Sequence, residues 1–538
     1  MCVENKESCS KLLMHLADCI DDQFSGMGKY TIPSLNMKNS KDMEHGSLVR
    51  FRCMIQDMFD PEMLPSCLKI ASGELKPIVL RDMVDFTEEN CTYLDNDATF
   101  LIYRYVFNCI PVPGESFWFK HELFKTENVL HSQDQPAGCS NIDNIKRPPG
   151  SGDETSLEDD TLSCKRFRDD SSTPASNQSI EKNQDSYLVK VYSDGDTFKL
   201  NDVVEFIGIL SKNEADLYDP TLYFRNGREK HSLHVIKAQI LSSFRSFHDI
   251  GDDQTKQENV EQSRKLAVDY LKGSLSNDEL AAEYLLCNLI CSTIRKELLI
   301  LAKFTLNLYN VDSDQADKIC NCLSLIYPKV QYLPLRLDIL NKESLVPRKD
   351  YESNCLETAR LQLSSGTLLI VDETKLTSGQ LNEQGIKNIA ALKTLIVHQK
   401  LDYDFVYHGV EFPTDLNILV LSEGISCLSN DYALPLNKSL ETLTLNNDIR
   451  SLNVIRQYLM NIRSTDFTIE DSVQEIIRDD FVNMRRNEAS VDQTRLHELL
   501  SLARWLNCSI KTQCLTESTW KKAKDMESAR RARMKLVP

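Results

Sequence analysis

Residues 368–373 read Leu-Leu-Ile-Val-Asp-Glu, four apolar side chains followed directly by two acids. A short apolar run of this kind predicts a buried strand of a parallel sheet, with Asp372 and Glu373 at its carboxyl end. This is the Walker B form of nucleotide-hydrolysing proteins, in which the Asp holds Mg²⁺ and the Glu polarises a water. Many buried strands also end in an acid, so we favour a structural or interface role for the pair, such as capping a loop or pairing with a lysine.

The sequence on both sides of this strand alternates between strand and helix patterns. Strand-like runs occupy 296–308 and 417–424, and 388–400 has the apolar spacing of a helix. An earlier helix is expected to begin at Ser-Asn-Asp-Glu (276–279), where Ser276 and Glu279 have the form of a capping box. Such alternation is typical of a parallel sheet covered by helices, and it predicts an α/β domain over 262–450.

A nucleotide site also needs a phosphate loop, and the sequence lacks one. No GxxxxGK[ST] string occurs in the 538 residues, although glycine amides and a lysine are what hold the phosphates in such a loop. The corresponding stretch, 303–315, keeps Lys303 and Thr305 but has no glycine. We therefore expect no cofactor and no catalytic residues. The alternative is a divergent ATPase that uses Asp372 and Glu373.

Strand patterns dominate the N-terminal half. Alternating apolar and polar residues predict a β-rich, barrel-like domain over 44–131, preceded by a helical or irregular segment over 1–43. Strand patterns resume over 186–261 and resemble part of an oligonucleotide/oligosaccharide-binding barrel, without the ladder of aromatic residues that stacks bases. The two regions form either one split barrel or two. Between them, 132–185 is rich in Ser, Asp, Asn, Pro and Gly, which predicts a disordered acidic linker.

The composition argues against several classes of partner. The chain has 41% hydrophobic residues and a formal net charge of −18. No apolar run approaches the roughly 20 residues of a membrane span, and the negative charge opposes direct binding to nucleic-acid phosphates. Seventeen cysteines are scattered without paired CxxC strings, and no HExxH occurs. We expect no membrane partner, no direct sequence-specific nucleic-acid partner, no disulfide framework and no metal.

Two short basic clusters lie within the predicted linker. One contains Lys146 and Arg147, and the other contains Lys165, Arg166 and Arg168. Both fit a nuclear import signal, and both equally fit ordinary solvated charge in a linker.

Several longer strings resemble the mini-chromosome maintenance (MCM) complex-binding protein family. They follow one another along nearly the whole chain outside the linker, and include VRFRCMIQDMFDPE (49–62), CIPVPGES (109–116), KFTLNL (303–308), PRKDYESN (347–354), LLIVDET (368–374) and QKLDYDFVYH (399–408). The resemblance implies a nuclear protein that binds MCM helicase subunits, reaches chromatin only indirectly, and takes part in assembling, stabilising or disassembling MCM complexes during DNA replication.

A second resemblance concerns the C-terminal half, which is similar in the order of its parts to the AAA+ ATPase domain of the MCM subunits. It implies that 451–538 forms a helical lid ending in a basic helix, with Arg495 at the position of a lid arginine. The expected fold class is thus α+β and multidomain. It combines N-terminal β-rich, barrel-like modules, a disordered linker, and a C-terminal degenerate AAA+-like α/β domain with a helical lid, a pseudo-ATPase.

Overall fold

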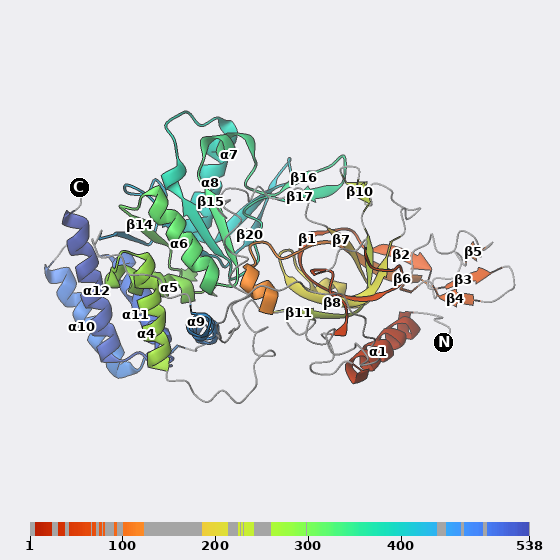
Figure 1. Ribbon diagram of the computed structural model, residues 1–538, viewed down its shortest axis with the longest axis horizontal. Coiled ribbons are helices and arrows are strands. Elements are labelled where there is room, and N and C mark those ends of the chain that lie inside the picture. Colours follow the sequence, from red (N-terminus) through yellow and green to blue (C-terminus); the bar gives the residue numbers. More distant parts are fainter. Residues whose placement is uncertain are drawn as a thin grey trace, which may run out of the picture.

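The computed structural model shows an elongated molecule with a β-rich N-terminal part and an α/β C-terminal part (Figure 1). It describes residues 6–23, 31–37, 42–65, 67–70, 75–77, 79–80, 91–93, 101–122, 186–212, 224–225, 228–229, 231–241, 260–296, 299–437, 448–463, 467–487 and 492–536. The predicted disordered linker and both basic clusters lie outside these residues.

Five strands of the N-terminal part close into a ring. β1 (Leu48–Met58) pairs antiparallel with β6 (Leu101–Ile110) on one side and with β8 (Val203–Ser211) on the other. β6 pairs with β7 (Tyr187–Val191), β7 pairs parallel with β11 (Ser232–Ile240), and β11 returns to β8. Strands from both β-rich regions therefore belong to one sheet, which answers the question that the sequence left open.

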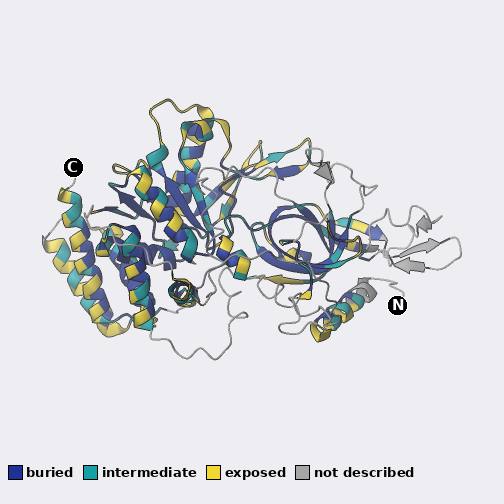
Figure 2. Cartoon of the chain, in the orientation of Figure 1, coloured by how far each residue is buried: buried dark blue, intermediate teal, exposed yellow. Residues whose placement is uncertain are grey.

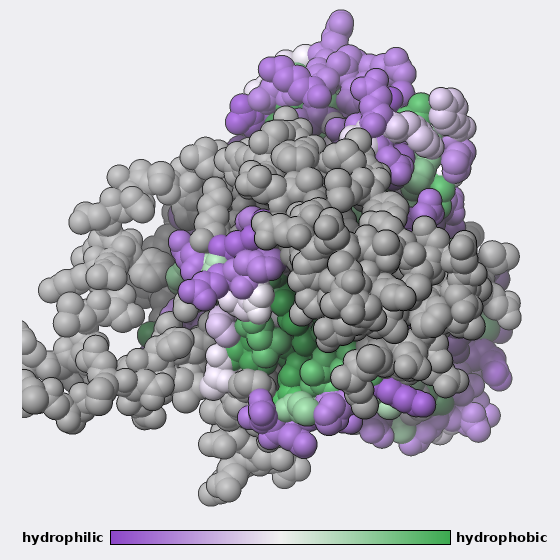
Figure 3. Space-filling view, turned by 90° about the vertical axis from the view of Figure 1, so that its right-hand side faces the viewer, coloured by the Kyte–Doolittle hydropathy of each residue, from purple (hydrophilic) through white to green (hydrophobic). Residues whose placement is uncertain are grey.

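Apolar side chains fill the ring. Phe51, Phe107, Phe206 and Leu233 come from four different strands and belong to one buried cluster. α1 (Lys6–Gln23) packs against β11 from outside, and hydrophobic side chains gather on this end of the molecule (Figure 3). The remaining strands of this part are β2 (Glu62–Pro65), β3 (Cys67–Ile70), β4 (Leu75–Pro77), β5 (Cys91–Tyr93), β9 (Phe224–Arg225) and β10 (Arg228–Glu229), with the 3₁₀ turn η6 (Gly195–Thr197).

The C-terminal part is built on the predicted parallel sheet. Its order is β15-β18-β21-β14-β22, and neighbouring strands run parallel. The strands are β14 (Leu306–Tyr309), β15 (Val330–Pro334), β18 (Leu368–Asp372), β21 (Asn417–Leu421) and β22 (Tyr432–Pro435). Leu421 is the register partner of both Asp372 and Leu308, so the carboxyl ends of three neighbouring strands lie level at one edge.

Helices cover both faces of this sheet, and its three central strands, β18, β21 and β14, are buried throughout (Figure 2). Leu368, Ile370 and Leu419 face one cluster, and Leu369, Val371 and Ile418 face the other, as expected for a strand buried on both sides. The first face is covered by α4 (Val260–Ser274), α5 (Glu279–Ile290), α6 (Ser313–Ile326), α9 (Ile449–Ile462), α10 (Asp471–Asn487), α11 (Gln493–Ser509) and α12 (Glu517–Leu536). The second face carries α7 (Leu337–Lys342) and α8 (Glu383–His398).

The C-terminal helices are part of this layer. Trp505 and Trp520 are almost fully buried in the same cluster as the sheet residues Leu306 and Ile370. The indole N–H of Trp505 donates to the carbonyl of Ala302 at 2.8 Å. The segment expected as a lid is therefore joined to the domain by a continuous hydrophobic core.

A small mixed sheet lies beside the parallel one. Its order is β17-β16-β19-β20, formed by β16 (Arg348–Asp350), β17 (Cys355–Glu357), β19 (Lys400–Asp404) and β20 (Gly409–Pro413). A further hairpin joins β12 (Ile294–Lys296) and β13 (Leu299–Leu301). The single strand predicted over 296–308 is thus wrong: the range contains the end of β12, all of β13 and most of β14, and Ala302, with a positive φ of 62°, lies between β13 and β14.

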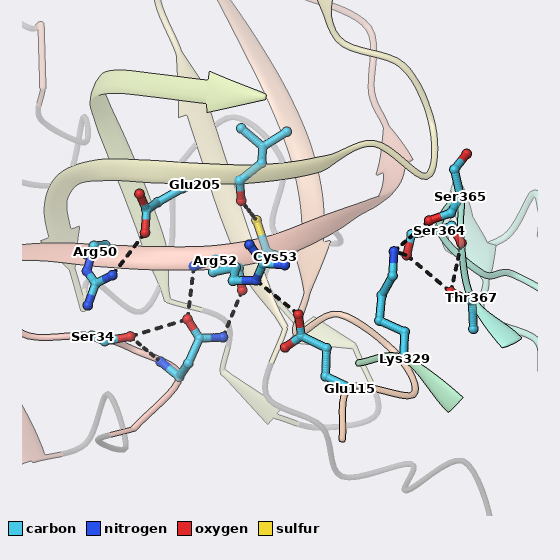
Figure 4. A network of polar contacts seen from close by, with 12 residues as sticks. Ser34, Arg50, Arg52, Cys53, Glu115, Glu205, Lys329, Ser364, Ser365 and Thr367 are labelled. Carbon is cyan, nitrogen blue, oxygen red and sulfur yellow. Dashed lines mark hydrogen bonds and ion pairs between the residues drawn. The ribbon is translucent and has the colours of Figure 1, made fainter. Parts of the chain in front are cut away.

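The two parts of the molecule meet along a polar seam. The Gln56 side chain donates to the Leu356 carbonyl at 2.8 Å, and the Leu356 amide donates to the Asp57 carboxylate at 2.6 Å. Next to the ring, a buried ion pair joins Arg52 and Glu115 at 3.0 Å (Figure 4). These contacts fix the ring against the α/β part through hydrogen bonds of buried groups, which are costly to leave unpaired.

Lys329 is a buried cation at this seam. Its ammonium donates to the Ser364 hydroxyl at 3.0 Å and to the Ser365 carbonyl at 2.6 Å (Figure 4). Burial, and then the positive charge of Arg52, lower the pKa of Lys329 to about 7. The seam therefore contains a group that titrates near neutral pH.

Within the described segments, no helix is both long enough and apolar enough to traverse a lipid bilayer.

Candidate functional site

The carboxyl edge of the parallel sheet holds the acidic pair predicted from sequence. Asp372 ends β18, and its side chain is fully buried. Its carboxylate accepts from the Tyr332 hydroxyl at 2.6 Å, the Thr374 amide at 2.9 Å and the Thr374 hydroxyl at 2.6 Å. Burial and the hydrogen bond to Asp372 raise the pKa of Tyr332. The Asp372 carboxylate is thus engaged by the protein and caps the 3₁₀ turn η8 (Glu373–Lys375).

Glu373 is engaged as well. Its carboxylate accepts from the Ser426 hydroxyl at 2.7 Å and from the Cys427 amide at 3.4 Å. Partial burial and then the charge of Glu373 raise the pKa of Cys427 to about 11. Asp372 therefore ties η8 to strand β15, and Glu373 ties it to the loop that contains Ser426 and Cys427, which are structural contacts.

The turn between β14 and α6 is where a phosphate loop would lie. This turn spans Asn310, Val311 and Asp312, and the amides of the first two donate to the Glu423 carbonyl at 3.0 Å and the Ser422 carbonyl at 3.1 Å. The Asp312 carboxylate caps α6 by accepting from the Gln315 amide at 2.9 Å. A carboxylate thus already occupies the end of the helix where a phosphate would bind, and two turn amides are used inside the protein.

In the structure, the residues predicted for the phosphate loop do not lie in the turn between β14 and α6. Lys303 and Thr305 precede β14, so they lie at the opposite edge of the sheet from Asp372. There the Lys303 ammonium pairs with the Asp431 carboxylate at 2.5 Å, and the Thr305 amide donates to the same carboxylate at 2.9 Å. The sequence predicts that the loop begins at Lys303, directly after the apolar run that ends at Ala302. In the structure β14 (Leu306–Tyr309) lies between that run and α6, so the turn lies at 310–312.

Lys375 is the lysine that the structure places near the start of α6. Its ammonium contacts the Ser313 hydroxyl and lies 3.3 Å from the Asp317 carboxylate. A hollow of about 580 Å³ opens beside it, lined by Arg336, Leu337, Asp338, Thr374, Lys375 and Thr377. Lys375 is not among the residues predicted from the sequence, although its position directly after Asp372–Thr374, at the end of a buried strand, is a usable signal.

Arg495 does not join the acidic pair. It lies in the first turn of α11, three residues before Glu498, whose carbonyl accepts from the Tyr432 hydroxyl at 2.5 Å. Tyr432 begins β22 opposite Leu306, at the amino edge of the sheet. Burial, and then the charge of Glu527, raise the pKa of Glu498 to about 7. Among the contacts of the described residues, none links Arg495 to Asp372 or Glu373.

The basic C-terminal helix is largely neutralised within the fold. Lys522 pairs with Glu283 at 3.0 Å, Lys524 pairs with Asp480 at 2.5 Å, and Arg533 pairs with Asp278 at 2.6 Å. Asp278 also caps α5, a role that the sequence analysis gave to Ser276. These pairs hold α12 on the domain, so much of its charge is directed inward rather than toward a partner.

No group of three or more His, Cys, Asp or Glu residues within the described ranges is arranged to hold a metal ion.

Comparison with known proteins places the whole chain in one family. Residues 26–534 match the family described as "Mini-chromosome maintenance replisome factor". The chain belongs to this family. It is 31% identical to the Mini-chromosome maintenance complex-binding protein of Gallus gallus, and the match covers 94% of this chain and 91% of that protein. The proteins of the same name from Homo sapiens and Drosophila melanogaster are each 30% identical, with 94% and 95% of this chain covered.

The family assignment confirms the resemblance seen in the sequence. The match includes the ring, the seam and the parallel sheet, because it extends across both parts of the molecule. In this member of the MCM-binding protein family, the two Walker B-like acids and the strand-to-helix turn are closed by internal hydrogen bonds.

Proposed function

We propose that this protein is a non-catalytic binding partner of MCM helicase subunits, acting in the assembly, stabilisation or disassembly of MCM complexes during DNA replication. The observation that carries the proposal is the match to proteins named for MCM complex binding, at about the same identity in vertebrates and in an insect, over more than nine-tenths of the chain.

The closed carboxyl edge supports the non-catalytic part of the proposal. Nucleotide hydrolysis requires a loop that wraps the phosphates and acids that hold Mg²⁺ and orient water. Here Asp372 and Glu373 accept hydrogen bonds from protein groups, and the Asp312 carboxylate occupies the start of α6. A triphosphate at this edge would find the amides of Asn310 and Val311 already bonded to carbonyls and the start of α6 already capped by a carboxylate.

The order of the parallel strands supports an AAA+-like body. Numbered by their position along the chain, the strands run 2-3-4-1-5 across the sheet, with the turn that replaces a phosphate loop after the first and the Walker B-like acids after the third. The closed ring with one parallel pair supports the likeness to an oligonucleotide/oligosaccharide-binding barrel. A body of this shape can occupy a place in an MCM assembly without contributing ATP turnover, an argument from fold analogy.

Nuclear localisation belongs to the same proposal. Its support is the two basic clusters at Lys146–Arg147 and Lys165–Arg168. Contact with chromatin follows only through the MCM partner, because the chain itself carries a net charge of −18.

Affinity purification of the tagged full-length chain from nuclear extract tests the proposal, with bound nucleotide measured in the same sample. We expect MCM subunits in stoichiometric amounts and no stoichiometric nucleotide on this chain. Absence of MCM subunits at low salt contradicts the proposed partner. Nucleotide on this chain, with ATP turnover that Glu373→Gln abolishes, establishes the divergent ATPase instead.

A further inference from the structure

Two exposed tyrosines meet at the tip of the small mixed sheet. Tyr351 lies in the turn between β16 and β17, and Tyr407 lies in the turn between β19 and β20. Their rings are 5.6 Å apart, and 51% and 85% of their surfaces are exposed. Val406, beside them, is 47% exposed. Tyrosines dominate the energetics of protein interfaces, and contiguous exposed apolar side chains mark interaction sites more often than isolated ones do.

The structure holds this tip rigidly. The Tyr351 hydroxyl donates to the Phe405 carbonyl at 3.0 Å, which links the two turns. The Val406 amide donates to the Asp404 carboxylate at 2.7 Å, and Val406 has a positive φ of 62°. That conformation is strained for a β-branched residue and persists only where the surroundings enforce it. A pre-organised aromatic tip loses little conformational entropy when it binds.

The turn between β16 and β17 is fixed by its own hydrogen bonds. The Asp350 carboxylate accepts from the Glu352 amide at 3.0 Å and from the Ser353 hydroxyl at 2.6 Å, and the Lys349 ammonium donates to the Asn354 carbonyl at 2.7 Å. Tyr351 and Tyr407 thus project from two turns whose backbone conformations are fixed by hydrogen bonds to side chains within each turn.

The charge around the tip decides between kinds of partner. The two hairpins, 348–357 and 400–413, contain three basic and six acidic residues, a formal charge of −3. Glu352, which follows Tyr351, and Asp404, which accepts from the Val406 amide, are both exposed at the tip. An acidic surface repels nucleic-acid phosphates, and a second copy of this acidic chain would bring like charges together. The complementary occupant is a protein surface with basic residues around an apolar pocket.

We propose that Tyr351, Val406 and Tyr407 form an aromatic docking tip that inserts into a basic-rimmed apolar pocket on an MCM subunit. This inference rests on the proposed function, because it takes the partner from there. It adds which surface of the chain makes the contact and what chemistry the partner must present.

The test is a titration of purified full-length chain with purified MCM subunits, comparing the parent with the double variant Tyr351→Ala/Tyr407→Ala. Both tyrosines are exposed, and the hydrogen bond from Tyr351 to Phe405 that the variant loses is local to the tip, so the melting temperature should fall by no more than a few degrees. We expect the dissociation constant to rise by about tenfold or more, as for loss of an aromatic hot spot. Phe117→Ala is the matched control, since Phe117 is 75% exposed and lies outside the tip. It should change the constant by less than about twofold.

Charge reversal supplies a second, independent variant. Glu352→Lys should weaken binding, and the parent should lose affinity as salt is raised because complementary charges are screened. Labelled single-stranded DNA at the same salt should show no binding that depends on the tyrosines. Sedimentation of the free chain should show no dimer that the double variant removes.

The outcomes separate the two proposals. If the parent binds MCM subunits and the double variant binds equally well, the docking tip is wrong while the proposed function stands. Tyrosine-dependent binding to DNA, or tyrosine-dependent dimerisation, overturns the assignment of the occupant. If the parent fails to bind any MCM subunit, the proposed function fails, and the docking tip fails with it.

Discussion

Asp372 is a buried carboxylate whose hydrogen bonds come from Tyr332 and Thr374. Asp372→Asn removes the charge and turns one acceptor into a donor, so it should lower the free energy of unfolding by about 1–3 kcal/mol. Glu373→Gln should cost less than about 1 kcal/mol, because Glu373 is only half-buried. Urea unfolding of both variants measures the difference. Equal, negligible costs would show that the Asp372 contacts do not stabilise the fold.

The seam lysine gives a prediction for pH. The ordinary pKa of lysine is roughly 10.4, whereas burial lowers the pKa of Lys329 to about 7 in the folded protein. Between these values the unfolded chain binds the extra proton, so the contribution of Lys329 to the free energy of unfolding rises with pH. Below pH 7 the group is protonated in both states, and its contribution is constant.

Lys329→Met removes this titration. The parent should therefore gain stability relative to the variant as the pH is raised from 7 to 9, and the difference should be flat from pH 5.5 to 6.5. Urea unfolding at each pH measures the difference in the free energy of unfolding between the parent and the variant. The other titratable groups are present in both proteins, so their contributions cancel in this difference. A difference independent of pH over the whole range would contradict a lowered pKa for Lys329.

Single residues show which structural features the sequence predicts and which it does not. Four consecutive apolar residues were enough to predict β18 and the position of Asp372 at its end. The Ser276 cap failed because Ser276 adopts a positive φ of 52°, while Asp278 makes the capping bond. A backbone dihedral that is set by tertiary contacts cannot be predicted from the local sequence, whereas a buried strand can be predicted from its run of apolar residues.

Among the elements, β8 carries a glycine that the ring requires. A Cβ at Gly208 would lie 2.1 Å from the carbonyl oxygen of His234 on β11, next to the irregular register at Val235–Lys237. Gly208→Ala should therefore lower the free energy of unfolding by about 1–3 kcal/mol, because backbone must move. Gly424→Ala is the matched control, since an added Cβ there meets nothing within 4 Å. Thermal melts of both variants test this, and equal melting temperatures would contradict the close approach of β8 and β11.

The positions of strands and helices along the chain were predicted better than which strands pair with one another. Alternating apolar residues indicated β1, and helical spacing indicated α8, because each pattern is local. The closure of the ring through β6 and β7 was not predicted, since these strands lie on opposite sides of the long segment 123–185. Pairing across such a separation is set by the fit of the whole core, which a single sequence does not display.

For the whole molecule, the seam decides whether the ring and the α/β part act as one body. Trp118 is 9% exposed, its indole N–H donates to the Ser324 carbonyl at 3.0 Å, and the Arg456 guanidinium stacks 4.1 Å from its ring. Trp118→Ala should cost about 3 kcal/mol and loosen this contact. We expect the ring to unfold separately from the α/β part, giving two transitions in urea. Phe117→Ala should keep the parent's profile, and a single unchanged transition in both variants would rule out this role for Trp118.

At this scale the family resemblance, the predicted parallel sheet and the helical C-terminus were all accessible from the sequence. The position of Arg495 was not, because it depends on how α11 packs along the sheet rather than over its carboxyl edge.

The most direct test of the account is an equilibrium titration of the purified chain with purified MCM subunits, made with the parent and with Glu373→Gln, while ATP turnover is followed in the same samples. A non-catalytic binding partner predicts that both proteins bind with the same affinity and that turnover per MCM subunit is identical in the two series. Turnover present with the parent and lost with Glu373→Gln would contradict it, as would binding that depends on Glu373.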